Sequence, residues 1–358
     1  MERTTQKAFK LQEQGKAAVI TAPVTEPAAG FVRVQVLAVA LNPTDWKHIT
    51  WWKGPPGINT TVGCDYSGVI DKLGPGANAD LKVGDYIAGF GYGANALDTE
   101  TGVFSEYANV DSHICFKIPE GMSTEEASTL GVATTTIGQA LYQKLQLPLP
   151  TKPATNSLPI LIYGGSTAVG NLTIQYAKLS GLTVITLASR RNHEFLLSLG
   201  ADAVFDYNDT NVAKMVREYT RDKLELALDT ISTEGSAAIV DECISSNGGK
   251  VVQILEVNTS KLRKDVQYSF VLAYTVFGND FKLLGAIDFK TLPDDRAFAI
   301  GFFKIAEKLL SEGKIKGHRV KLMPDGLSGI NKGLSLLQDG KVSAEKLVYR
   351  IAEGHSRI

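Results

Sequence analysis

The arrangement of hydrophobic and polar residues differs between the first third of the chain and the rest. Over residues 31–39 hydrophobic and polar residues alternate, and glycines interrupt the segments around 63–68 and 74–76. Side chains of a strand point alternately to its two faces, so this pattern predicts half-buried strands separated by turns. We therefore expect a barrel-like β unit at the start of the chain.

The period changes near Pro159. An apolar run at 160–163 precedes a glycine-rich turn, hydrophobic residues at helical spacing follow over 169–179, and a second apolar run covers 184–187. This is the pattern of a βαβ unit. The alternation continues with strands predicted at 203–205, 224–228 and 250–255 and helices predicted near 192–199, near 211–219 and from 233 onwards. Repeated βα units indicate a parallel, doubly wound sheet.

Two later segments complete the pattern. Residues 297–310 predict a long amphipathic helix, and residues 346–351 alternate like a strand that rejoins the first unit. At roughly 150 residues per domain, a chain of 358 residues favours two domains. We expect an α/β protein with a barrel-like domain formed by residues 1–130 and 290–358 and a doubly wound parallel-sheet domain formed by residues 131–289.

The charge balance argues against large charged partners. Lys and Arg number 37 and Asp and Glu 38, which gives a formal net charge of -1. A chain with so small a net charge has no overall electrostatic field that would attract nucleic acid or an anionic membrane surface. The longest stretch without charge, residues 155–177, contains Pro159, Gly164 and Gly165 and is not expected to span a membrane. We expect a small-molecule partner, no nucleic acid and no membrane.

The cysteines indicate in which cellular compartment the protein is found. Cys64, Cys115 and Cys243 are far apart and form no C-x-x-C pair, which disfavours a disulfide framework or a cysteine-built zinc site. Residues 1–20 are rich in charge and lack the apolar region of a signal peptide. We predict a cytoplasmic protein, either a monomer or a homodimer.

A glycine-rich turn carries the clearest local chemistry. It lies between the strand at 160–163 and the following helix and is a variant of G-x-G-x-x-G. Glycines there let the backbone approach a pyrophosphate at a helix N-terminus. A plain tight turn is the alternative, but the βαβ context favours a dinucleotide. The candidate cofactor-binding residues are Gly164, Gly165, Ser166, Thr167, Ala168 and Val169.

The end of the second strand bears on which dinucleotide is bound. A site specific for NAD places Asp or Glu there to bind the ribose hydroxyls. This chain has instead Ser189, Arg190, Arg191 and Asn192. Guanidinium groups beside a hydroxyl suit a 2′-phosphate, so we predict NADPH as the cofactor. The alternative is that both arginines are the solvated start of a helix.

Five segments of the chain form a recognisable family pattern, namely Asn-Pro-Thr-Asp-Trp-Lys at 42–47, the segments 63–70, 83–86 and 205–207, and the glycine turn. On these segments the chain resembles, over nearly its whole length, the medium-chain dehydrogenase/reductases, which combine a GroES-like β-barrel catalytic domain with a Rossmann domain. Within this family the chain is most similar to a zinc-independent, quinone-oxidoreductase-like branch. That branch includes fungal trans-acting enoyl reductases and aldehyde reductases.

The chain departs from the zinc-dependent members of this family at the ligand positions. Asn42, Cys64 and Val132 stand where those enzymes place zinc ligands. Cys64 with Asp65 cannot close a tetrahedral site, and three cysteines cannot make a four-cysteine structural site. We therefore predict no metal. Without a Lewis acid, alcohol oxidation loses its usual electrophile, whereas reduction of an activated C=C or C=O remains.

The resemblance also implies catalytic residues. It places Lys47 and Thr136 near the nicotinamide and the substrate carbonyl, where each can stabilise a developing oxyanion. The alternatives are a surface cation on a loop for Lys47 and a helix-start hydroxyl for Thr136. The family pattern adds further cofactor-binding candidates, namely Thr44, Asp45, Trp46, Lys47, Tyr207, Ile254, Leu255, Val342 and Ser343.

Together these residues predict an NADPH-dependent, zinc-independent reductase of the enoyl reductase type. It would transfer hydride to the activated C=C of an α,β-unsaturated carbonyl, which is free or bound to a carrier. One alternative is an aldehyde or quinone reductase on the same scaffold. Another is a protein that binds NADPH without catalysis.

Overall fold

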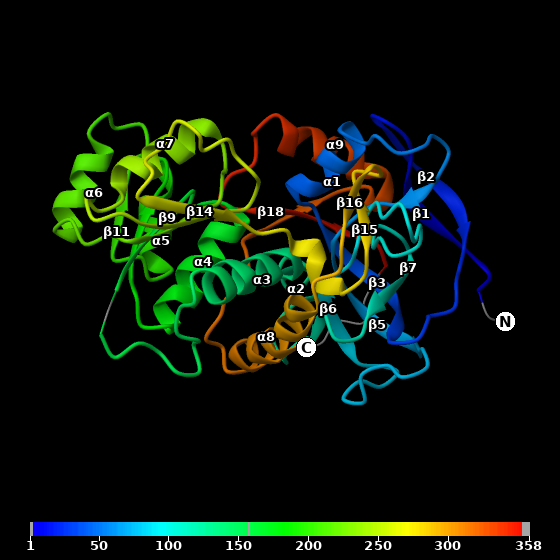
Figure 1. Ribbon diagram of the computed structural model, residues 1–358. Helices are drawn as coiled ribbons and strands as arrows, with labels where there is room; N and C mark the ends of the chain where they lie inside the picture. The colour runs from blue at the N-terminus through cyan, green and yellow to red at the C-terminus, as the bar shows by residue number, and fades with distance from the viewer. Residues whose placement is uncertain (1–2, 157, 353–358) are drawn as a thin grey trace. The chain divides into compact units, whose positions relative to one another are not determined.

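The structure, a computed structural model, describes residues 3–156 and 158–352 (Figure 1). The chain divides into two compact units. The first combines residues 1–135 with residues 274–358, and the second is formed by residues 136–273. The first unit is therefore assembled from both ends of the chain.

The first unit is built around β3, at the position of the strand predicted at 31–39. Its larger sheet has the order β17-β18-β3-β5-β6-β8, with β7 also paired to β3, and its smaller sheet has the order β2-β1-β4. The strand predicted at 346–351 is confirmed as β18, which pairs antiparallel with β3 and so rejoins the first unit. The strands are β1 (Thr5–Glu13), β2 (Lys16–Pro23), β3 (Phe31–Ala40), β4 (Thr60–Thr61), β5 (Asp65–Leu73), β6 (Tyr86–Phe90), β7 (Tyr107–Asp111), β8 (Cys115–Lys117), β15 (Phe281–Leu283), β16 (Ile287–Phe289), β17 (Val320–Met323) and β18 (Lys346–Arg350).

Helices cover the sheets of this unit. The amphipathic helix predicted at 297–310 is confirmed as α8, which buries Phe302, Phe303 and Leu310. The helices are α1 (Pro43–Thr50), α2 (Thr124–Ala127), α8 (Pro293–Ser311), α9 (Gly326–Gln338) and the 3-10 turn η3 (Ala273–Phe277), while α3 (Gly131–Ile137) spans the boundary to the second unit.

The second unit contains the predicted doubly wound sheet. Its strands have the order β11-β10-β9-β12-β13-β14, and every neighbouring pair is parallel. In chain order this is 3-2-1-4-5-6, the arrangement of dinucleotide-binding sheets. The elements are β9 (Pro159–Tyr163), α4 (Ala168–Leu179), β10 (Thr183–Leu187), η2 (Arg190–Asn192), α5 (His193–Ser198), β11 (Ala203–Phe205), α6 (Val212–Thr220), β12 (Leu226–Asp229), α7 (Glu234–Cys243), β13 (Gly249–Gln253) and β14 (Val266–Phe270), preceded by the π-helical η1 (Gly138–Lys144).

Aromatic contacts hold residues 274–289 in the first unit, whereas the sequence-based division placed this segment in the second domain. Tyr274 stacks on Tyr92 with ring centroids 4.5 Å apart, and Phe277 lies 4.9 Å from Phe90. Phe281 meets Tyr92 edge-on at 5.6 Å. These long-range contacts, which leave no local sequence signal, tie the segment to β6 and the loop after it.

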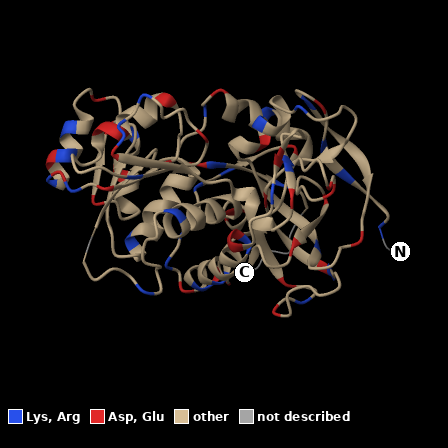
Figure 2. Cartoon of the chain, in the orientation of Figure 1, with Lys and Arg blue, Asp and Glu red and all other residues tan. Residues whose placement is uncertain are grey.

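Charges of both signs are interspersed along both units in Figure 2. This agrees with the balanced composition of the chain. Among the described residues no helix is long and apolar enough to cross a membrane.

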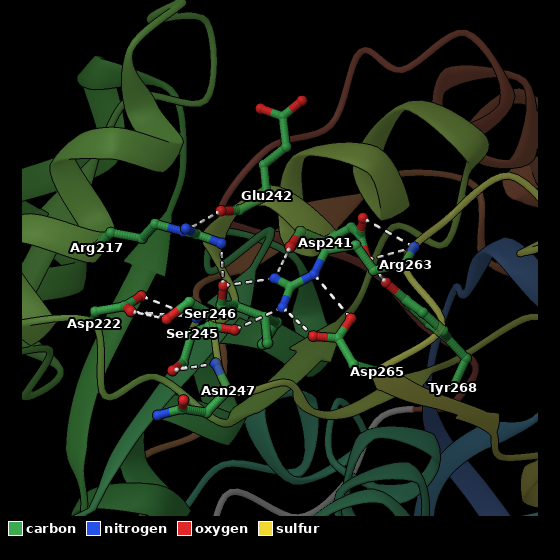
Figure 3. A network of polar contacts seen from close by, with 11 residues as sticks. Arg217, Asp222, Asp241, Glu242, Ser245, Ser246, Asn247, Arg263, Asp265 and Tyr268 are labelled. Carbon is green, nitrogen blue, oxygen red and sulfur yellow. Dashed lines mark hydrogen bonds and ion pairs between the residues drawn. The ribbon is translucent and has the colours of Figure 1, made fainter.

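Two arginines cap the C-terminal end of α7 (Figure 3). Arg217 donates to the carbonyl oxygens of Glu242 at 2.8 Å and Ile244 at 2.6 Å. Arg263 donates to those of Ile244 at 2.9 Å and Ser245 at 2.8 Å. The last carbonyls of a helix lack partners within the helix, and cations there also oppose its dipole. The network therefore fixes α7 against β14 and α6.

Replacing Arg263 by methionine lowers the free energy of unfolding by about 1–3 kcal/mol, because carbonyls at the end of α7 lose charged donors. Urea unfolding followed by circular dichroism measures this. Lys261→Met, which removes an exposed cation two residues earlier, is the matched control and leaves stability within about 0.5 kcal/mol. Equal stability of the two variants contradicts a capping role for Arg263.

Candidate active site

The glycine turn between β9 and α4 accepts no larger residues at two of its positions. A Cβ on Gly165 would lie 2.1 Å from Thr186 Oγ1, and one on Gly170 would lie 2.2 Å from the Gly164 carbonyl oxygen. Gly164 itself has a φ of +80°. The turn therefore places backbone without side chains next to the N-terminus of α4. The N–H groups and the helix dipole there suit a pyrophosphate. The turn fits a dinucleotide.

Hydroxyl contacts lock this turn in place. Thr167, the N-cap of α4, accepts a hydrogen bond from the Gly170 N–H at 2.9 Å. Thr230 Oγ1 donates to the Tyr163 carbonyl oxygen at 2.7 Å and lies 2.9 Å from Thr167 Oγ1. The candidates at 166–169 are half-buried, so a ligand can reach them. Sequence reasoning missed Thr230, which follows β12 and has no motif around it.

The candidates for 2′-phosphate binding directly follow β10. Arg190 and Arg191 are exposed on η2, and the described residues offer neither guanidinium a hydrogen bond or a salt bridge. Asn192 is buried, and its Nδ2 donates to Ser189 Oγ at 3.3 Å. Two solvent-facing guanidinium groups beside a held hydroxyl suit an anionic ligand.

The remaining candidates of the second unit lie at the ends of other strands. Ile254 and Leu255 directly follow β13, and the Ile254 N–H donates to Ser232 Oγ at 2.9 Å. Tyr207 lies just after β11, with its ring 6.1 Å from that of Tyr163. All these residues therefore meet at the carboxyl edge of the parallel sheet, where such sheets bind nucleotides.

In the first unit, the start of α1 carries a chain of buried polar contacts. Thr44 Oγ1 lies 2.7 Å from the Tyr274 hydroxyl and 3.2 Å from His48 Nδ1. The Tyr274 hydroxyl also lies 3.5 Å from Cys64 Sγ. Sequence reasoning missed Tyr274, because it lies in a segment without periodicity.

A buried ion pair lies next to the first residue of these contacts, at the N-cap of α1. Lys346 Nζ donates to Asn42 Oδ1 at 2.8 Å and pairs with Asp65 Oδ2. Asp65 Oδ1 accepts from the Val132 N–H at 2.6 Å. Lys346 is 3% exposed and Asp65 0%. Sequence reasoning missed Lys346, because its partners Asn42 and Asp65 lie 304 and 281 positions earlier in the chain.

Burial shifts the pKa values of three groups next to these contacts. It raises the pKa of Asp45 to about 7, although the Asn42 N–H donates to Asp45 Oδ2 at 2.7 Å. It lowers the pKa of His48 to about 4 and raises that of the Cys64 thiol. Asp45 Oδ1 and His48 Nε2 are buried without a hydrogen-bond partner in the described structure. At neutral pH His48 is therefore uncharged and Cys64 is a thiol.

Lys47 lies on α1 and not on a loop. Its Nζ is 5.7 Å from the Trp46 ring centroid and 5.5 Å from that of Trp51. The side chain is half-buried, and desolvation lowers its pKa. Trp51 is 45% exposed, whereas Trp52 and Tyr66 belong to the core. Two indole faces thus hold the ammonium at the surface of this unit.

Thr136 lies near the end of α3 and not at a helix start. It is 6% exposed, and the π-helical η1 begins two residues later. Such π-helical insertions occur frequently at functional sites. Val342 and Ser343 are half-buried in the connection between α9 and β18, close in sequence to Lys346. The roles of these residues stay predictions.

The described residues contain no group of three or more His, Cys, Asp or Glu side chains placed to hold a metal ion. At the positions where the zinc-dependent enzymes have ligands, Asn42 instead accepts from the Lys346 ammonium. A buried ammonium repels a second cation, so this donor set does not fit zinc.

Comparisons with known proteins agree with this architecture. A family model described as alcohol dehydrogenase GroES-like domain matches residues 28–120, and one described as zinc-binding dehydrogenase matches residues 168–269. Among solved structures, a putative zinc-dependent alcohol dehydrogenase from Rhizobium etli superposes with a TM-score of 0.80 at 24% identity, covering 98% of this chain and 99% of that one. The CurK enoyl reductase superposes at 0.76 and 18% identity, covering 97% and 99%. These likenesses show the fold.

Curated relatives are closer in sequence. The chain is 40% identical over 350 residues to the trans-enoyl reductase ACTTS2 of Alternaria alternata, covering 97% of this chain and 99% of the relative. It is 40% identical over 354 residues to the trans-enoyl reductase resD of Aspergillus sclerotiorum, covering 94% and 98%. It is 46% identical over 251 residues to the trans-enoyl reductase TOXD of Cochliobolus carbonum, covering 70% and 83%.

Proposed function

Because the chain belongs to the medium-chain dehydrogenase/reductase family and is an oxidoreductase related over its whole length to trans-enoyl reductases, we propose that it reduces the activated C=C of an α,β-unsaturated carbonyl with NADPH. The observation that carries the proposal is the 40% identity over 97% of the chain. The substrate is a small carbonyl compound, either free or held as a carrier thioester.

Different candidate residues bind the nucleotide and stabilise the reacting carbonyl. The turn at 164–170 binds the pyrophosphate, and Ser189, Arg190 and Arg191 bind the 2′-phosphate. The bound nucleotide supplies the hydride. As hydride adds to the β-carbon, negative charge moves onto the carbonyl oxygen, where Lys47 and Thr136 act as donors. Solvent supplies the proton that the α-carbon takes up.

Consumption of NADPH at 340 nm with a panel of acceptors tests the proposal. We expect turnover with a trans-2-enoyl thioester and little with a saturated aldehyde or a quinone. Preferential turnover of an aldehyde or a quinone supports that reductase on the same scaffold instead. Nucleotide binding without turnover of any acceptor contradicts catalysis.

Replacing Arg190 by alanine weakens NADPH binding by about ten- to a hundredfold and leaves NADH binding nearly unchanged, because only NADPH loses a charge-assisted phosphate contact. Calorimetric titration of both nucleotides measures this. Lys214→Ala, which removes an exposed cation on α6, is the control. Equal affinity of the unaltered protein for NADPH and NADH contradicts the assignment.

We expect the purified protein to contain no stoichiometric zinc and to keep its activity after treatment with a chelator. The reason is the Lys346 ammonium, which lies on Asn42 where a ligand would be needed. Elemental analysis and assays before and after chelation measure this. Activity lost on chelation and restored by zinc overturns the prediction.

A further inference from the structure

The loop after β12 is held by the carboxylate of Asp229, the last residue of that strand. Asp229 is 0% exposed, and its Oδ1 accepts from the Ile231 N–H at 3.0 Å and from the Ser232 N–H at 2.9 Å. Its Oδ2 accepts from the Ser236 hydroxyl at 2.7 Å, in the first turn of α7. Because a buried carboxylate requires such donors, Asp229 fixes the course of the chain from β12 into α7.

Ser232 joins this loop to the end of the neighbouring strand β13. Its hydroxyl donates to the Asp229 carbonyl oxygen at 2.9 Å and accepts from the Ile254 N–H at 2.9 Å. Ser232 is 7% exposed and has a φ of +56°, which a residue with a Cβ rarely adopts. Such a backbone conformation persists only where the surrounding contacts hold it, and it occurs preferentially at functional sites. Asp229 and Ser232 thus form a clamp between the ends of β12 and β13.

The clamp is joined directly to candidate nucleotide-binding residues of the same unit. One of them, Ile254, donates to the clamp. On the other side, Thr230 Oγ1 lies 2.9 Å from the hydroxyl of Thr167, the N-cap of α4. A Cβ on Gly164 would lie 3.0 Å from Ile231 Cγ1, so the Ile231 side chain packs next to the glycine turn. The loop after β12 is therefore in contact with the turn proposed to bind the pyrophosphate.

Two large apolar side chains next to the clamp are open to solvent. Ile231 is 40% exposed and Leu255 36%, and each is adjacent in sequence to one partner of the hydrogen bond between Ile254 and Ser232. A sheet with the order 3-2-1-4-5-6 has one mononucleotide-binding half on each side of its switch point. The candidates for the 2′-phosphate follow β10 in the first half, so the ends of β12 and β13 belong to the half that takes the nicotinamide.

We propose that Asp229 and Ser232 are positioning residues for the nicotinamide half of the dinucleotide. They do not touch the ligand but hold Ile231 and Leu255 where these side chains contact it. Because the clamp orders both loops before the ligand arrives, binding does not include the entropy cost of ordering them. The inference rests on the proposed binding of NADPH.

Calorimetric titration with NADPH and with adenosine 2′,5′-bisphosphate tests the role of the clamp, because the bisphosphate carries the 2′-phosphate but lacks the nicotinamide half. In Ser232→Ala the Ile254 N–H loses its acceptor and the two loops lose their link. We expect the affinity for NADPH to fall about tenfold and that for the bisphosphate to stay unchanged. Ser245→Ala is the matched control and alters neither affinity. Ser245 is also buried and its hydroxyl accepts from the Asn247 N–H at 3.2 Å, but it precedes β13 at the opposite edge of the sheet.

Thermal unfolding checks that the variants fold, and Ser232→Gly is a second variant that adopts the positive φ without strain. The same selective loss of NADPH affinity is expected in it. An unchanged ratio of the two affinities in Ser232→Gly overturns the positioning role, whether both ligands bind more weakly or neither does. Selective loss of NADPH affinity without turnover of any acceptor contradicts enoyl reduction but supports the clamp. Failure of the unaltered protein to bind NADPH overturns the two proposals together.

Discussion

The Lys346→Met variant is expected to lose about 3–5 kcal/mol of unfolding free energy, the largest stability effect of any single substitution proposed for this protein. The ammonium pairs with Asp65 and donates to Asn42 Oδ1 at 2.8 Å, in a site where Asp65 is wholly buried. Methionine fills most of the space but leaves the Asp65 carboxylate without its counter-charge. Urea unfolding at pH 7 measures the loss.

Two further variants isolate the charge effect. Lys346→Met combined with Asp65→Asn removes both charges and keeps an oxygen that accepts from the Val132 N–H, so it recovers most of the lost stability. Lys321→Met breaks a salt bridge to Glu345, the residue just before the neighbouring strand β18. The Lys321 side chain is 46% exposed, so its loss costs less than about 1 kcal/mol. If Lys346→Met is no less stable than Lys321→Met, the ion pair does not hold this region.

The parts of the fold that could be predicted are those with a local pattern of hydrophobic residues. The apolar runs that became β9 and β10 lie in the middle of a parallel sheet and are buried on both faces, so their sequence is continuous and easily recognised. The edge strand β14 was not predicted, because four of its five residues are exposed or half-buried and form no apolar run. Pattern reasoning therefore identifies the buried central strands, whereas of the two edge strands it identifies β11 and misses β14.

The same distinction holds for the candidate site. The turn at 164–170 is a local motif whose glycines are required by contacts within a few residues or with the adjacent strand, as at Gly165 against Thr186. Lys346 and Asn42 are separated by 304 positions, and Thr44 and Tyr274 by 230. Contacts at such separations depend on how β18 and η3 return to the first unit. No local pattern in the sequence therefore predicts them.

The largest effect on catalysis is expected from Lys47→Ala and Thr136→Val. Each removes a donor that we place at the carbonyl oxygen of the substrate, where negative charge appears only as hydride adds. Loss of such a donor lowers kcat by about a hundred- to a thousandfold at most, and by less where water takes its place, with a smaller change in substrate binding. Steady-state kinetics with an enoyl thioester and an aldehyde measure this.

Nearby residues of the same type supply the controls. Lys53→Ala removes an exposed lysine shortly after α1, and Thr135→Val removes the hydroxyl that donates to the Gly131 carbonyl oxygen within α3. Neither is placed at the carbonyl, so neither lowers kcat as Lys47→Ala and Thr136→Val do. If those two variants instead bind NADPH normally and turn over at the unaltered rate, the donors lie elsewhere. If they lose only NADPH affinity, the two side chains position the nicotinamide, and hydride transfer depends on orientation alone with solvent supplying the proton.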